Sequence, residues 1–312
     1  MRVALTAALF LIPLLAHAGE SSGNSTTPLL DFAKEQPLPQ QPFAEDANKR
    51  LATVQAQIAS HPPPPDAECA HTLGAIRFAR LYEDLASAQT TRGDSKGAIE
   101  AYGKALACTP RVAYLYANLA SEQLHIGHLA EARTTAQRGV AIDGGDRTLD
   151  SVLSQIDFVE EHWAEAVGRL RAMATVEPDD ERAQYWLMFL WLAQRRAGTR
   201  EPELVTRAEY DLWPTPILET LQSRLSEARL LDLIRKEEDD HRRREMLAEA
   251  LYYVGQMRLA NGDADTARRY FAATVSLKVT YFIEHHLALA EIGKARAKMQ
   301  AASQTARQTT RQ

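Results

Sequence analysis

The sequence has few cysteines and lacks the short motifs by which common enzyme classes are recognised. Only Cys69 and Cys108 occur among 312 residues, which excludes a disulfide-rich scaffold. There is no H-E-x-x-H, C-x-x-C or P-loop sequence. Their absence argues against zinc proteases, thioredoxin-like oxidoreductases and nucleoside triphosphatases. The one G-x-S-x-G match, Gly19 to Gly23, lies in a polar segment rich in Ser and Thr and not in the strand–turn–helix context of a serine hydrolase. We therefore expect a protein that is not an enzyme and that uses no cofactor.

The chain also lacks an excess of basic residues and a convincing set of metal ligands. Its net charge is −5, whereas a general nucleic-acid binder carries a basic face, so we expect no nucleic-acid partner. Adjacent histidines on a helix, such as His285 and His286, point about 100° apart and do not easily share one ion. Asp263 and Asp265 lack the further ligands of a calcium loop, so we predict that they cap a helix and that no metal is bound.

The first 18 residues have the pattern of a secretory signal peptide. A basic start precedes an apolar segment over residues 4–16, and an A-x-A sequence ends at Ala18. The apolar segment is shorter than the roughly 20 residues that span a bilayer, which favours a cleaved signal over the alternative, a membrane anchor. We predict cleavage after Ala18 and a bacterial periplasmic location, with a secreted protein as the other interpretation. Gly19 follows the site instead of cysteine, so no lipid anchor is expected.

A 34-residue pattern recurs along the chain. Full units start at Ala79, Ala113, Arg147 and, after a gap, Ala248, and a degenerate unit starts at Glu181. Position 20 of each full unit is alanine, position 24 is alanine or a larger apolar residue, and position 32 of the first three units is proline or glycine. This order predicts a helix–turn–helix unit. We therefore expect an all-α fold, an α-solenoid of antiparallel helix pairs.

The spacing within the first unit resembles the tetratricopeptide repeat. The residues that carry the resemblance are Leu85, Ala86, Gly93, Ala98, Tyr102, Ala105 and Pro110. The match covers residues 79–180 and 248–281 well and residues 181–212 weakly. The resemblance implies a scaffold that binds other proteins.

Composition divides the rest of the chain. Residues 19–65 are predicted to form a flexible tether, rich in Ser, Thr, Gln and Pro near its start, with a short helix at 43–60 and a stiff spacer at Pro62–Pro65. The repeat array occupies residues 66–212. Residues 213–293 form a C-terminal helical region that ends in a capping helix over 279–292. Residues 294–312 contain basic residues and no acid, and we expect a disordered tail.

The two cysteines lie at neighbouring ends of the first helix pair. Cys69 precedes its first helix and Cys108 is near the end of its second helix. Antiparallel helices bring these ends together, and two cysteines of one domain often pair in an oxidising compartment. We predict a disulfide; two buried thiols are the alternative.

The first helices of the units are expected to line a concave face that binds a partner. The predicted groove residues are Tyr114, Ser121, Leu124, Gln155, Phe158, Tyr185 and Phe189. Aromatic anchors beside polar side chains suit an extended peptide or a partner helix. The alternative is that the aromatic residues belong to the core, as stripes at helical spacing usually do.

The C-terminal half has a second, narrower resemblance. Trp213-Pro214-Thr215-Pro216, the run from Ala250 to Gly255, Asn261-Gly262-Asp263 and Phe282-Ile283-Glu284-His285 are similar in order and spacing to the new-lipoprotein-I family of bacterial envelope adaptors. The resemblance implies a dimeric scaffold that docks cell-wall hydrolases and a periplasmic processing protease. This chain lacks the lipidated cysteine of that family. The alternatives are an accessory subunit for secretion or outer-membrane assembly, and an enzyme with an unrecognised site in residues 197–245.

Overall fold

The chain folds into α-helices throughout the part that is described. The computed structural model describes residues 27–36, 43–176, 181–199 and 213–309. No strand occurs within these ranges, which confirms the all-α prediction for them. The helices are α1 (Pro28–Glu35), α2 (Phe43–Ser60), α3 (Asp66–Cys69), α4 (Ala75–Thr91), α5 (Ser95–Cys108), α6 (Ala113–His125), α7 (Leu129–Val140), α8 (Arg147–Val159), α9 (Trp163–Val176), α10 (Glu181–Arg196), α11 (Thr215–Leu221), α12 (Glu227–Arg235), α13 (Asp240–Ala260), α14 (Ala264–Ser276) and α15 (Ile283–Thr309).

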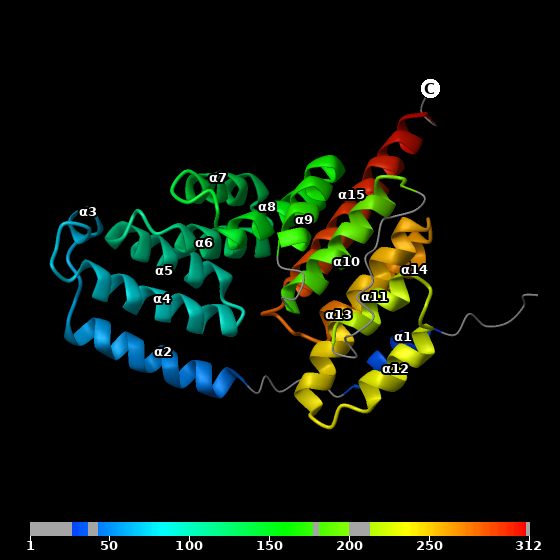
Figure 1. Cartoon of the computed structure of the whole chain (residues 1–312), viewed down its shortest axis with the longest axis horizontal. Coiled ribbons are helices and arrows are strands. Elements are labelled where there is room, and N and C mark those ends of the chain that lie inside the picture. Colours follow the sequence, from blue (N-terminus) through cyan, green and yellow to red (C-terminus); the bar gives the residue numbers. More distant parts are fainter. Residues whose placement is uncertain (1–26, 37–42, 177–180, 200–212, 310–312) are drawn as a thin grey trace, which may run out of the picture.

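Consecutive helices pack as pairs, an architecture that fits an α-solenoid (Figure 1). The pairs α4–α5, α6–α7, α8–α9 and α13–α14 each have a turn of three residues between their helices. The alanine at position 20 of every full unit is fully buried where the two helices of a pair meet. A larger side chain there would force the helices apart, since packed interiors tolerate little extra volume. The recurring alanine therefore explains why the pairs are closely packed.

The turns repeat as regularly as the helices. Their middle residues are Gly93, Gly127, Glu161 and Gly262, and all four have positive φ angles, between 63° and 85°. Glycine adopts this left-handed conformation without strain. After two of these turns an aspartate caps the next helix: Asp94 accepts from the Gly97 amide and Asp263 from the Thr266 amide, each at 3.1 Å. The sequence-based role of Asp263 as a cap is thus confirmed.

The N-terminal segment does not match the predicted tether. Residues 28–35 form α1, which packs against α12, α13 and α14 and buries Leu29, Leu30 and Ala33. Helix α2 packs along α4 at the opposite end of the molecule (Figure 1). The composition-based prediction was wrong for residues 28–35, because Pro28 is compatible with a helix start and the apolar residues that follow share one helical face. The short helix predicted at 43–60 is confirmed as α2. Residues 19–26 lie outside the described residues, as does the predicted signal peptide.

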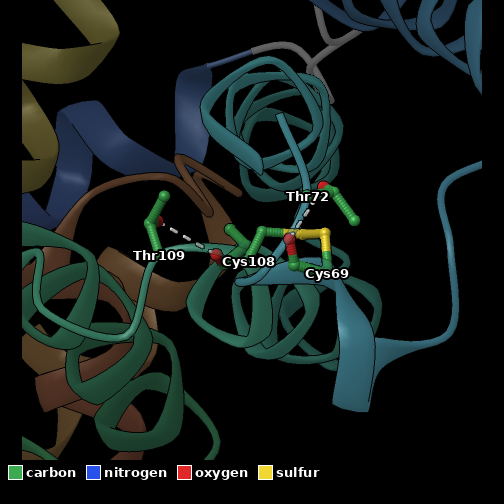
Figure 2. The surroundings of a disulfide bond; sticks show 5 residues. Cys69, Thr72, Cys108 and Thr109 are labelled. Atoms are coloured by element: carbon green, nitrogen blue, oxygen red, sulfur yellow. Dashed lines mark hydrogen bonds between the residues drawn. A yellow bond between two sulfur atoms is a disulfide. The ribbon is translucent and has the colours of Figure 1, made fainter. Parts of the chain in front are cut away.

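A disulfide joins Cys69 and Cys108 (Figure 2). Cys69 ends α3 and Cys108 ends α5, and both side chains are buried. The Thr72 hydroxyl donates to the Cys69 carbonyl at 2.9 Å, which helps the chain to turn back from α3 into α4. The bond therefore ties α3, which precedes the first helix pair, to the C-terminal end of α5, the second helix of that pair.

The C-terminal segment also differs from the prediction. Helix α15 begins at Ile283 and continues to Thr309, so residues 294–309 are helical and the predicted disordered tail is wrong for them. Alanine, glutamine, lysine and arginine, which dominate this segment, are strong helix formers. Residues 200–212, the end of the predicted repeat array, lie outside the described residues. Among the helices described, none is both long and apolar enough to cross a membrane.

The C-terminal helices fold back onto the first helices of the array. Helix α13 packs against α10, and α15 packs against α6 and α8. In Figure 1, α15 (red) runs behind the green helices of the array. The inner face of the array is therefore partly covered by the chain's own C-terminal region.

Candidate functional site

A pocket of about 520 Å³ lies between the array and the C-terminal region. Helices α6, α8 and α10 form one wall, and α13 with residues 281–284 forms the other. The helices of the first wall are the first helices of three consecutive units. The pocket thus lies on the face that the sequence predicted as a groove. That groove is not open along its length, because the C-terminal region covers part of it.

The array wall carries side chains that both donate and accept hydrogen bonds. Asn118 and Ser121 lie one helical turn apart on α6, and Ser151 and Gln155 lie one turn apart on α8. Residues three or four apart share a helix face, so each helix directs a polar row into the pocket. Amide and hydroxyl groups of this kind match the alternating donors and acceptors of a peptide backbone.

The opposite wall contains two buried carboxyl groups, those of Glu249 on α13 and Glu284 on α15. Their exposed fractions are only 3% and 4%. Glu249 accepts hydrogen bonds from the Tyr185 hydroxyl at 2.9 Å and from the Trp213 indole, and Glu284 accepts one from Tyr253 at 2.9 Å. Burial, reinforced by the charge of Glu284, raises the pKa of Glu249 to about 8. Glu249 is therefore largely protonated at neutral pH, and burial raises the pKa of Glu284 as well.

A third carboxyl group at the pocket, that of Glu122, remains ionised. Burial alone would raise its pKa, but hydrogen bonds from His125 and Thr90 outweigh that effect and lower it. The Thr90 hydroxyl donates to Glu122 at 2.7 Å, and the His125 ring lies 3.5 Å away. Arg147 also lines the pocket, so the lining contains both positive and negative groups.

The predicted groove residues separate into those that line the pocket, those in the core, and Tyr114, which lies outside both. Ser121, Gln155, Tyr185 and Phe189 line the pocket. Leu124 and Phe158, the latter only 1% exposed, belong to the core instead.

The placement of Phe158 has a specific cause. Its ring packs edge-on against Trp163 and Phe189, with centroids 5.3 Å and 5.4 Å away. Phe189 in turn contacts the tyrosines of α13. Tyr114 stands outside the pocket, 44% exposed, and donates to Glu83 at 3.1 Å. An open aromatic groove does not form because α13 covers α10.

Sequence reasoning missed the residues of the second wall. Glu249 is a single acid inside the apolar run from Met246 to Val254, and a carboxyl group in such a run is unusual for a core helix. This signal was available and could have marked the position. The contribution of residues 281–284 had no comparable signal, because it depends on how α15 folds back.

The described residues contain no cluster of three or more histidine, cysteine, aspartate or glutamate side chains that could hold a metal ion. No protein-family model matches the chain.

Proposed function

We propose that this chain is a tetratricopeptide-type α-solenoid that acts as a non-catalytic adaptor and binds partner proteins in the pocket on its inner face. The observation that carries the proposal is the pair of polar rows on α6 and α8, which come from consecutive units and point into one pocket. Repeat arrays commonly use their concave surfaces to bind extended partners. Hydrogen-bonding side chains spaced along such a surface suit the backbone of a bound segment.

The volume of the pocket limits what it can hold. An α-helix with its side chains is about 11 Å across and advances about 5.4 Å per turn, so one turn fills roughly 500 Å³. The pocket, at about 520 Å³, therefore takes a segment of about four residues. This favours a chain end or a short extended stretch of the partner over a long helix or a folded domain.

The compartment and the partners belong to the same proposal. The signal-peptide pattern of residues 1–18 and the resemblance of the C-terminal half to envelope adaptors favour partners in the bacterial periplasm. Cell-wall hydrolases and a processing protease are the classes that the resemblance implies. The same resemblance implies a homodimer, and sedimentation at the mass of one chain would refute that part alone.

A pocket-filling substitution tests the binding proposal. Ser121→Trp places a large side chain in the pocket, whereas Thr134→Trp places it on the exposed face of α7. In-cell crosslinking followed by mass spectrometry should recover the same envelope protein with the unmodified chain and with Thr134→Trp, and should lose it with Ser121→Trp. Recovery of no envelope protein, or equal recovery with both variants, would contradict the proposal. Circular dichroism checks that the variants fold.

A further inference from the structure

Two histidines from distant parts of the chain stack where α15 meets the array. The rings of His125 on α6 and His286 on α15 lie 4.0 Å apart and within 10° of parallel. His125 lines the pocket, and residues 281–284, which form part of its second wall, directly precede His285 and His286. We call residues 277–286 the cap segment. The stacked pair is a direct contact between this segment and the array.

Both ring nitrogens of His286 face carbonyl oxygens, which a neutral imidazole ring cannot satisfy at the same time. Its Nδ1 lies 3.1 Å from the His125 carbonyl oxygen, and its Nε2 lies 2.7 Å from the Thr280 carbonyl oxygen. A neutral imidazole has one N–H donor, so it can donate to one of these carbonyls while its bare nitrogen faces the other. A protonated ring would donate to both, but it would carry its charge away from water and against a second histidine.

Burial is the stronger of these effects. It lowers the pKa of His286 to about 3, with the facing His125 ring acting in the same direction, while the Thr280 carbonyl and Glu122 oppose the shift. The neighbouring His285 also disfavours a charge there. On α13, His241 faces Tyr281 of the cap segment, but Glu245 lies 3.5 Å from its ring and compensates a positive charge. His286 thus contacts the array directly, and the effect of Glu122 on its pKa is smaller than that of burial.

We propose that the His125–His286 stack is a pH-sensitive latch that holds the cap segment over the pocket and releases it on acidification. The direction of the pH effect follows from the difference between the pKa of His286 in the closed state and in the open state. A histidine in water has a pKa of about 6.5, so the open state binds a proton more strongly than the closed state. The latch is at full strength above pH 6.5 and weakens as the pH falls towards 3. With these two pKa values, the ratio of open to closed molecules should rise about 25-fold between pH 7 and pH 5.

Two of the acids at the pocket do not titrate in the same range. Glu249, with a pKa of about 8, is protonated throughout the range from pH 6.5 to 5. The pKa of Glu122 is lowered, so this group stays ionised over that range. Glu284 also lines the pocket and has a pKa raised by burial, so the variants described below assign a change between pH 6.5 and 5 to histidine or to this acid.

Electron paramagnetic resonance distance measurements test the latch without any ligand. Spin labels are attached at Ala130→Cys on α7 and Leu289→Cys on α15, both exposed positions. The native cysteines form a disulfide and do not take the label. We expect a second, longer distance to gain population between pH 7 and pH 5, while circular dichroism shows unchanged helix content.

Two variants assign the change to this site. His286→Gln removes the titrating group and should abolish the pH dependence, whether the variant rests closed or open. His128→Gln changes an exposed histidine on the array and should leave the pH dependence intact. An unchanged distance in the parent chain, a distribution that narrows at pH 5, or a pH dependence that survives His286→Gln would each overturn the latch. Its use as a gate rests on the proposed binding function, but the motion is measured separately from partner capture.

Discussion

Replacing Glu249 by glutamine should remove a loss of stability that the native protein suffers as the pH rises from about 4.5 to 8. The side chain is 3% exposed, and its pKa is raised from 4.5 to about 8 in the folded chain. The unfolded chain releases this proton near pH 4.5, whereas the folded chain retains it until about pH 8. Unfolding is therefore increasingly favoured as the pH rises through this window, and the effect levels off above it.

The magnitude follows from the two pKa values. Each pKa unit corresponds to 1.36 kcal/mol, so the shift of about 3.5 units from 4.5 to 8 is worth up to about 5 kcal/mol. Between pH 5 and pH 9 the contribution of this one group changes by about 4 kcal/mol. Glutamine is neutral at every pH and lacks this dependence. Its NH₂ group cannot accept a hydrogen bond as the carboxyl oxygen does from Trp213, and that loss of about 1–3 kcal/mol is the same at each pH.

Urea denaturation at a series of pH values from 5 to 9, followed by circular dichroism, measures the difference. The unfolding free energy of Glu249→Gln should depend less on pH than that of the parent chain, by about 4 kcal/mol over this range. Glu131→Gln, a change at an exposed acid of α7, should keep the parental dependence. Parallel curves for the parent chain and Glu249→Gln would refute the assignment of a buried, protonated carboxyl group.

Three further changes test the packing of the fold, each measured by the urea midpoint. Leu29→Ala should cost about 2–5 kcal/mol because the side chain is fully buried between α1 and the C-terminal helices; a cost below 0.5 kcal/mol would mean that α1 is not docked. Gly255→Ala should destabilise, because an added Cβ would lie 2.9 Å from Phe271 and Tyr270, whereas Gly103→Ala, with open space around it, should stabilise by about 0.5–1 kcal/mol; the opposite order would contradict the packing of α13 on α14. Cys69→Ser opens a disulfide that spans 39 residues and should cost about 4 kcal/mol, and equal stability with and without reductant would contradict the bond.

The repeat units of the fold were predictable because their pattern is local. The pattern depends on helices that are joined by a turn of only three residues. It consists of the alanine at position 20 of each unit and the turn glycines at 93, 127 and 262. The period therefore located α4 to α9 and the α13–α14 pair. Composition was a weaker guide. It predicted a flexible tether from residue 19 and a disordered tail over residues 294–312, although α1 and the end of α15 lie in these segments.

The site was only half predictable, for a related reason. The polar residues of α6 and α8 follow from helical spacing, and Ser121 and Gln155 line the pocket as their positions suggested. The second wall depends on contacts between residues far apart in sequence: Tyr185 bonds to Glu249, 64 residues away, and His286 contacts His125, 161 residues away. Such contacts leave no periodic pattern in one sequence. Burial of Phe158 follows from such contacts and agrees with the alternative that its helical spacing had offered, a place in the core.

Site-specific photocrosslinking in cells tests most directly whether the pocket is the partner site. A photoreactive amino acid at Gln155, which lines the pocket, is compared with one at Glu165, which is exposed on α9. The proposal predicts an adduct with an envelope protein at Gln155 and none at Glu165, and predicts that Ser121→Trp abolishes the adduct. An adduct at Glu165 alone, or one at Gln155 that persists with Ser121→Trp, would contradict it.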